Sequence, residues 1–146
     1  MQKQLQELTN SLVKLFTAHR KCVLQQSQAC GLYVGQPQVL EYIRSHPGCT
    51  QNEIANALGV SPASIAFSTK RLQASGILMK QVNNLDMRRN RLYVTTDGIE
   101  ALDKFENKFC DLNERIFEGF SEEELRQLEN FSTRVTENLE KIMKEE

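Results

Sequence analysis

The feature that most constrains this chain is a pair of short helical segments joined at Gly59, in the stretch TQNEIANALGVSPASIAFSTKRLQASG. Thr50 can cap the first segment, and Glu53 follows three residues later, as a capping box requires. Ser61 can cap the second segment, and Pro62 fits its first turn, where a missing backbone N–H costs nothing. Two capped helices with so short a connection predict a helix-turn-helix.

A basic hairpin is predicted directly after these helices. Ile77–Val82 and Arg91–Thr95 have the composition of strands, and the polar segment 83–90 lies between them. A wing of this kind suits a narrow minor groove of DNA, because the negative potential focused there attracts guanidinium groups. Asp86 stands two residues before Arg88, so in a tight loop its carboxylate can hold that guanidinium in a bidentate pair. The predicted DNA contacts of the wing are Asn83 and Asn84, which form a turn, and Asp86, Arg88, Arg89 and Arg91.

The second helix of the pair is predicted to enter the major groove of double-stranded DNA. Helical periodicity turns Ile65, Thr69 and Leu72 towards the core. Serine hydroxyls can bond base edges or phosphates, apolar side chains can touch a thymine methyl, and arginine can bind guanine or phosphate. The candidates on the outward and flanking positions are Ala63, Ser64, Phe67, Ser68, Lys70 and Arg71. Thr50, Gln51 and Ser61 at the helix starts complete the set, and the first two are placed for a phosphate.

The distribution of charge supports a partner that carries phosphates. The net charge of the whole chain is only −1. Residues 50–96 carry six Lys/Arg and two Asp/Glu, whereas residues 97–146 carry seven Lys/Arg and fifteen Asp/Glu. A basic centre beside an acidic segment indicates that only one face approaches nucleic acid. A solvated charge pattern without a partner, and a winged-helix module that binds protein instead of DNA, are the alternatives.

Long amphipathic segments flank the helix-turn-helix on both sides. Apolar residues recur at steps of three and four in Leu5–Val23, Ile99–Phe120 and Leu125–Ile142. A small lobe cannot cover three such stripes, so a second copy of the chain is expected to bury them; a monomeric helical cap over the core is the alternative. The predicted organisation is a dimerisation helix and connection at 1–34, a winged helix-turn-helix lobe at 35–96, and dimerisation helices at 97–146.

Other classes of function lack support in the residues. The four cysteines form no CxxC pair and there are only two histidines, so neither a metal site nor a cofactor is expected. The sequence has no phosphate-cradling glycine loop and no nucleophile motif, which argues against an enzyme. No segment has the pattern of a signal peptide or a membrane span, so a cytoplasmic protein without membrane contact is expected.

Taken together, these motifs resemble the MarR family of bacterial transcription regulators. The resemblance runs from about Pro37 to the C-terminus and rests on Gln51–Ser61, Leu72–Gly76, Asp86–Arg89, and Val94 and Thr95 with Gly98. It implies a triangular winged-helix homodimer that represses from a palindromic operator and releases DNA in response to a ligand or an oxidant. It also implies that Arg88 is the wing arginine, that Asp86 is its partner and that Ser64 is a recognition-helix contact.

The chain departs from the family in three ways. Phe67 stands where the family often has arginine, so the reading of bases can differ. Cys22 lies only fifteen residues before Pro37, which is too close for the reactive cysteine of the peroxide-sensing branch. The scarcity of histidine, with none after His46, argues against the zinc-sensing branch.

By the same resemblance, an effector binds between the DNA-binding lobe and the dimer region. The expected lining is Phe16, His19, Cys22, Val23 and Tyr42, together with the start of the 97–118 helix, and the expected effector is a small aromatic or lipophilic molecule. Oxidation of Cys22 or Cys30 is the alternative trigger. The alternative is a purely structural role. In that case His19 belongs to the core or the dimer interface, and the cysteines, Cys49 and Cys110 included, are packed apolar residues.

Overall fold

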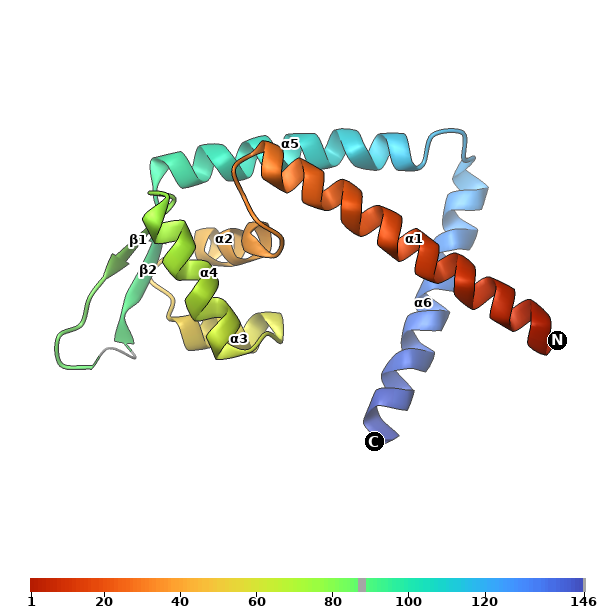
Figure 1. Cartoon of the computed structure of the whole chain (residues 1–146), viewed down its shortest axis with the longest axis horizontal. Coiled ribbons are helices and arrows are strands. Elements are labelled where there is room, and N and C mark those ends of the chain that lie inside the picture. Colours follow the sequence, from red (N-terminus) through yellow and green to blue (C-terminus); the bar gives the residue numbers. More distant parts are fainter. Residues whose placement is uncertain (87–88, 146) are drawn as a thin grey trace. The chain divides into compact units, whose positions relative to one another are not determined.

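The computed structural model describes residues 1–86 and 89–145, and it is mainly helical with one small sheet (Figure 1). The order along the chain is α1 (Gln2–Ala29), α2 (Gln36–Ser45), α3 (Gln51–Leu58), α4 (Pro62–Ala74), β1 (Leu78–Gln81), β2 (Arg91–Val94), α5 (Thr96–Ile116) and α6 (Glu122–Glu145). The chain forms two compact units, Met1–Cys110 and Asp111–Glu146. The predicted fold class, mainly α with a helix-turn-helix and a small β-wing, is confirmed.

Local hydrogen bonds set the ends of the helix-turn-helix. Thr50 Oγ1 accepts from the backbone N–H of Glu53 (3.3 Å), and the Glu53 carboxylate accepts from the Thr50 N–H (2.6 Å), so the predicted capping box is present. Gly59 ends α3 with a φ of 62°, in the left-handed region that favours glycine. Ser61 Oγ accepts from the N–H of Ser64 (3.2 Å) and caps α4, as predicted.

A single hydrophobic core holds the lobe of the first unit together. Its fully buried large apolar side chains come from the α1–α2 connection, the helices α2 to α4, β2 and the start of α5: Leu32, Leu40, Ile43, Ile54, Ile65, Leu72, Leu92 and Leu102. Because all of these elements contribute to one cluster, α4 is fixed to its neighbours along its inner face. Its outer face is therefore presented on a rigid support.

β1 and β2 form an antiparallel pair in which Leu78 lies opposite Val94 and Gln81 lies opposite Arg91. Both strands are shorter than the predicted 77–82 and 91–95. At one end Thr95 already turns into α5, and at the other the N–H of Asn83 donates to the Asn90 side chain (2.9 Å) and not to the strand ladder. On its other edge β2 pairs at Leu92 with Cys49, through an isolated antiparallel bridge.

The start of α5 is packed closely against the sheet. Thr95 Oγ1 donates to the carbonyl of Gly76 (2.7 Å) and accepts from the N–H of Gly98 (3.1 Å). A Cβ atom on Gly98 would lie 2.3 Å from the carbonyl oxygen of Ile77 and 2.7 Å from Cγ1 of Val94. Glycine is required there by the close approach of the helix to Ile77, just before β1, and to Val94 in β2, and this explains the Thr-x-x-Gly pattern noted in the sequence.

The long helices at the two ends of the chain bury little of their apolar surface within their own units. In α1 the exposed apolar residues are Leu5, Leu8, Val13, Leu15 and Phe16. In α6 they are Leu128, Phe131, Val135, Leu139, Ile142 and Met143, and no described residue of that helix is buried. The core of the lobe does not cover these long apolar stripes, so another surface is expected to bury them.

Candidate nucleic-acid interface

The start of α3 uses its polar side chains within the fold. Gln51 Nε2 donates to the hydroxyl of Thr69 (2.8 Å), and that buried hydroxyl donates to the carbonyl of Ile65 (2.9 Å). Gln51 therefore joins α3 to α4, and Thr50 is engaged in the capping box. The N–H of Glu53 in the first turn already donates to Thr50 (3.3 Å), so the first-turn N–H groups that remain for an anion are those of Gln51 and Asn52.

The two faces of α4 differ as the sequence predicted. Ile65, Thr69 and Leu72 are buried. Of the predicted contacts on the other face, Ala63, Ser64, Phe67 and Lys70 are exposed, while Ser68 and Arg71 are half-buried. The Ser61 hydroxyl, also exposed, donates to the hydroxyl of Ser64 (2.9 Å). The outer face thus combines hydroxyl groups, two cations and one exposed aromatic ring, the groups with which a recognition helix reads bases and phosphates.

Arg71 stacks on aromatic rings. Its guanidinium carbon lies 3.5 Å from the centroid of the Tyr33 ring and 5.5 Å from the centroid of the Phe67 ring. Tyr33 is not among the contacts predicted from the sequence, because it belongs to the connection between α1 and α2. No local spacing rule brings residues 33 and 71 together, and only the tertiary fold does.

Asn83 organises the tip of the wing. Its Oδ1 accepts from the N–H groups of Leu85 (3.0 Å) and Asp86 (3.3 Å), which forms the predicted turn. Arg89 Nε lies 3.6 Å from Oδ2 of Asp86. Arg88, and with it the predicted pair between Asp86 and Arg88, lies outside the described residues.

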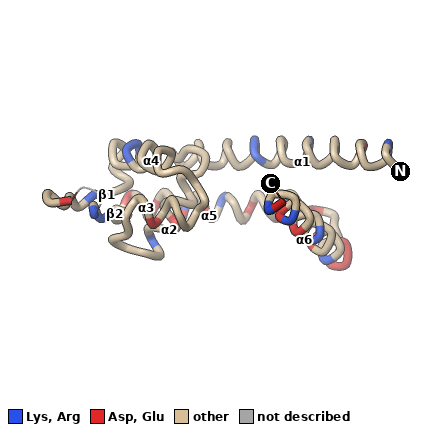
Figure 2. The backbone as a smooth tube through the Cα atoms, turned by 90° about the horizontal axis from the view of Figure 1, so that it is seen from below, with Lys and Arg blue, Asp and Glu red and all other residues tan. Residues whose placement is uncertain are grey.

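Arg91 begins β2 and has a partner within the lobe. Its Nη1 donates to the carbonyl of Gly48 (2.9 Å), in the segment that pairs with the outer edge of β2. The exposed Arg91 and Arg89 carry positive charge along the described part of the wing. Figure 2 shows Lys and Arg on α4 and around the two strands, and it shows the cluster of Glu at the first turn of α6.

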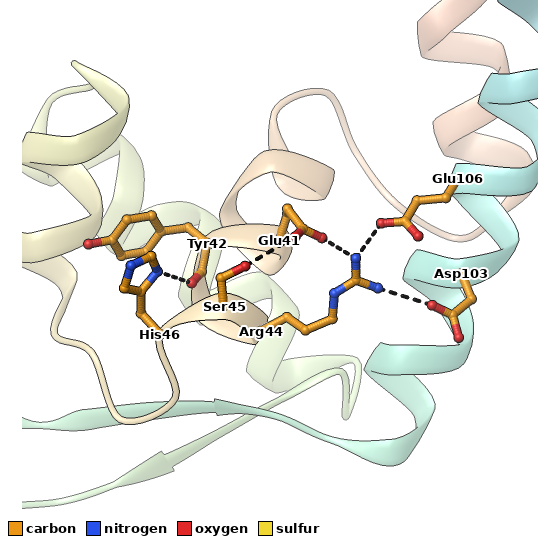
Figure 3. A network of polar contacts seen from close by, with 7 residues as sticks. All are labelled: Glu41, Tyr42, Arg44, Ser45, His46, Asp103 and Glu106. Carbon is orange, nitrogen blue, oxygen red and sulfur yellow. Dashed lines mark hydrogen bonds and ion pairs between the residues drawn. The ribbon is translucent and has the colours of Figure 1, made fainter.

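An ion cluster joins α2 to α5 on a different part of the lobe (Figure 3). Arg44 Nη2 pairs with Glu106 (2.6 Å) and Glu41 (2.5 Å), and its Nη1 pairs with Asp103 (3.1 Å). The hydrogen bond to Glu106, followed by the attraction of the three carboxylates, raises the pKa of Arg44 above its ordinary value. The i,i+3 pair of Glu41 and Arg44 is visible in the sequence, whereas the approach of α5 is not.

Of the five predicted effector-binding residues, the structure places Tyr42 in a hollow. Tyr42 stacks on His46 and lines that hollow with Leu58, Leu102 and Phe105. The other four residues lie on α1 and are not among those that line it: Phe16 and His19 are exposed, while Cys22 and Val23 are half-buried. Leu102 and Phe105 in this lining belong to α5, and none of the lining residues belongs to α1 of the same chain.

The cysteines occupy different environments. Cys30 and Cys49 are buried, and burial raises the pKa of the Cys49 thiol. Cys22 is half-buried. The expectation that Cys110 is packed is wrong within the single chain, because its side chain is exposed on the α5 helix.

In the described part of the chain, no three His, Cys, Asp or Glu side chains gather in a way that could hold a metal ion. Among the same residues, no helix is both long and apolar enough to cross a membrane.

The geometry of the lobe agrees with comparisons to known proteins. A family model described as winged helix-turn-helix DNA-binding matches residues 36–79. The HTH-type transcriptional regulator BilQ of Clostridioides difficile is 30% identical over 108 residues, which cover 74% of this chain and 70% of that protein. The BilQ protein of Clostridium symbiosum is 28% identical over 113 residues, or 77% of this chain and 76% of that protein.

Solved structures show the same fold over almost the whole chain. The crystal structure of the MarR family transcription regulator SP03579 has a TM-score of 0.85 at 22% identity, covering 99% of this chain and 95% of that one. Staphylococcus aureus MarR, solved with salicylate and kanamycin, has a TM-score of 0.78 at 20% identity, covering 93% and 92%. The complex of S. aureus MepR with DNA has a TM-score of 0.69 at 25% identity, covering 91% and 98%.

The helix-turn-helix of the lobe and these relatives define a transcription regulator with a winged-helix DNA-binding domain. The chain belongs to the MarR family.

Proposed function

We propose that the protein is a homodimeric repressor that binds a palindromic operator and is released from it by a small molecule. The observation that carries the proposal is the division of α4 into a buried inner face and an outer face of hydroxyl and cationic groups on a rigid support. In the proposed complex this face lies in the major groove and the wing arginines lie in the adjacent minor groove. The DNA contacts are the full set predicted from the sequence, with Gln51 contributing its backbone N–H.

The dimer follows from the apolar stripes of the terminal helices. Segments 1–34 and 97–146 form the dimerisation region, and segment 35–96 forms the DNA-binding lobe. Two recognition helices about one turn of B-DNA apart, ~34 Å, match the two halves of a palindrome. The exposed apolar residues of α1 and α6 support this assembly, because a second copy of the chain can cover them.

The proposed effector is a small aromatic or lipophilic molecule that binds beside Tyr42. The hollow there is walled mainly by apolar and aromatic side chains between α2 and α5, where the DNA-binding lobe meets a proposed dimerisation helix. An effector that fits only one separation of the two lobes would shift the population towards that separation. The S. aureus MarR structure, solved with salicylate and kanamycin, makes small-molecule binding a reasonable expectation for this fold.

The first experiment is the selection of bound sequences from a random duplex library at two salt concentrations. Recovery of a palindrome with half-sites about one helical turn apart, ~10 bp, is the expected result. Binding that depends on salt but enriches no sequence would replace the proposal with an architectural role. A protein that binds no duplex at either salt concentration, after removal of bound ligands and reduction of thiols, would favour the protein-binding module.

A substitution then tests the wing. Arg88→Ala is expected to weaken operator binding about tenfold or more at moderate salt and to reduce the dependence of affinity on salt. Arg126→Ala is the matched control, because that exposed arginine lies on α6 and pairs with Glu123 (2.9 Å). Unchanged operator affinity for Arg88→Ala would refute the assignment of the wing.

A further inference from the structure

The connection between α1 and α2 lies beside the outer face of α4. One hollow is lined by Tyr33, Val34 and Gln36 from the connection and the start of α2, and by five residues of α4: Ala63, Ser64, Phe67, Ser68 and Arg71. A second hollow shares Val34, Ser64 and Ser68 with the first. The surface around the recognition helix is therefore built by two segments that are far apart in the sequence.

Arg71 is held at this surface by its planar face. Its guanidinium lies over the Tyr33 ring at 3.5 Å, with the Phe67 ring at 5.5 Å. Among residues 1–86 and 89–145, no carboxylate lies within ion-pair distance of Arg71 and no acceptor bonds its guanidinium N–H groups. The rings thus restrain the cation while its N–H donors stay available to another molecule, an arrangement for which arginine is suited and lysine is not.

The Tyr33 ring is itself carried by a fixed backbone. The N–H of Tyr33 donates to Oε1 of Gln36 (2.8 Å), and the carbonyl of Tyr33 accepts from the N–H of Gln36 (3.0 Å). Gln36 is 3% exposed and the preceding Leu32 is 1% exposed, so both neighbours are anchored in the lobe. The Tyr33 residue itself is 49% exposed.

We propose that Tyr33 is a positioning residue for DNA specificity, whose ring, with that of Phe67, orients the Arg71 guanidinium to bind the O6 and N7 edge of a guanine. The proposal rests on the proposed function and adds a specificity device to it. An arginine that is oriented before binding loses less side-chain entropy on contact, and the bidentate match to guanine demands a defined guanidinium plane. Phe67, at a position where the family often has arginine, then supplies the second aromatic ring beside the Arg71 guanidinium.

The test measures operator binding by proteins that differ at position 33. Binding is measured to the operator selected by the wild-type protein and to each of its single base-pair variants. Tyr33→Leu is expected to weaken operator binding about fivefold, because the Arg71 side chain must then be ordered on binding, with the loss concentrated at one G·C pair in each half-site. Tyr33→Phe is expected to retain both affinity and discrimination. Val34→Ala, in the same hollow but outside the stack, is the matched control.

Two further comparisons separate the stack from a general structural role. Pentafluorophenylalanine at position 33 has nearly the shape of phenylalanine but an inverted ring quadrupole, so it is expected to behave like Tyr33→Leu. If Tyr33→Leu fails to fold, the pentafluorophenylalanine variant replaces it in the binding measurements. In an Arg71→Lys background, Tyr33→Leu is expected to have no further effect, because the planar cation is gone.

The outcomes distinguish this inference from the function on which it rests. If the wild-type protein selects no sequence, the proposed function fails and the inference fails with it. If the wild-type protein selects an operator but Tyr33→Leu discriminates its base pairs as well as the wild type does, only the inference is overturned. A loss that is equal for all sequences indicates a phosphate contact and overturns it too.

Discussion

The lobe and the terminal helices of this protein carry the same kind of sequence pattern with opposite results. In the lobe, residues such as Leu40, Ile54 and Ile65 are at most 2% exposed. In α1 and α6, residues at equally regular spacing are largely open, for example Phe16 at 63% and Phe131 at 55%. Helical periodicity therefore predicts that a face is to be buried, but the partner that buries it is a separate question.

The two regions also differ in the length of their helices and in how much of each helix is packed. In the lobe, α2, α3 and α4 have only 8 to 13 residues each, and all three pack into one common core; Thr50 and Ser61 also cap α3 and α4. The α1 helix has 28 residues, and its N-terminus has no side-chain cap. A long helix with an uncovered stripe depends on packing for its stability, since isolated helices are marginal in water. The first region can thus be stable alone, whereas the second is expected to need a second copy.

The largest expected effect is on assembly. Phe131→Ser is expected to weaken a dimer about tenfold to a hundredfold, because the ring is 55% exposed in the single chain and each copy loses the burial of that part, worth about 1 kcal/mol or more. Sedimentation equilibrium over a concentration series measures this. Thr133→Ser, also exposed in α6, is the control. An unchanged monomer–dimer equilibrium would mean that α6 is not part of the interface.

A core truncation is expected to act on the lobe itself. Leu40→Ala, at 0% exposure, is expected to lower the free energy of unfolding by about 2 to 5 kcal/mol, through lost burial and the cavity left behind. Met79→Ala, at 57% exposure, is expected to change it by less than about 0.5 kcal/mol. Urea unfolding of both variants measures the difference. Equal effects would remove the distinction between core and surface in the lobe.

The junction of the two regions lies at the start of α5. Gly98→Ala is expected to lower the free energy of unfolding by about 1 to 3 kcal/mol, because the new Cβ meets the Ile77 carbonyl and the Val94 side chain. Helix propensity alone predicts the opposite sign, a gain of about 1 kcal/mol. Urea unfolding decides between them, with Glu100→Ala on the exposed side of α5 as control. A more stable Gly98→Ala protein would show that α5 can move away from the sheet at little cost.

The smallest expected effect is on the pH dependence of stability, through two capping boxes. One is formed by Thr50 and Glu53 in the lobe, and the other by Ser121 and Glu124 at the start of α6. In each, hydrogen bonds from the backbone and the hydroxyl of the capping residue lower the pKa of the glutamate. A lowered pKa contributes stability above the unfolded value, and that stability is lost as pH falls through the folded pKa. Stability is therefore expected to fall more steeply between about pH 5 and about pH 2 in the wild type than in Glu53→Gln.

Thermal unfolding across this pH range measures the slope, and Glu124→Gln provides the same comparison for α6. Thr50→Ala is expected to flatten the slope as Glu53→Gln does, since it removes one of the donors that lower the pKa of Glu53. Parallel pH curves for the wild type and Glu53→Gln would contradict a role for the capping box in acid stability.

The helix-turn-helix was predictable from residues close together in the sequence. Thr50 with Glu53, Gly59, and Ser61 with Pro62 each act within one turn of helix, so their effect needs no knowledge of the fold. The strands were predicted too long because their ends depend on other segments, namely the turn into α5 at Thr95 and the side chain of Asn90. The exposure of Cys110 was missed because α5 extends beyond the core that buries its first turns.

The candidate site also has features that local sequence predicts and features that depend on the tertiary fold. The outward face of α4 follows from helical periodicity, and it emerged as predicted. The internal bond of Gln51 to Thr69, the stack of Arg71 on Tyr33 and the approach of Arg44 to Asp103 and Glu106 join residues separated by 18 to 62 positions. No short-range rule assigns such partners.

By itself, the sequence determined the order of the elements, the caps of the helix-turn-helix, the faces of α4 and the presence of apolar stripes at both ends. These depend on backbone conformation and on hydrogen bonds within a few residues, for which propensity and spacing suffice. The tertiary structure alone decided which side chains meet across elements: the aromatic support of Arg71, the ion cluster at Arg44 and the close packing at Gly98. The physical reason is that contact between distant segments depends on how a shared core brings their surfaces together, and local conformation does not contain that information.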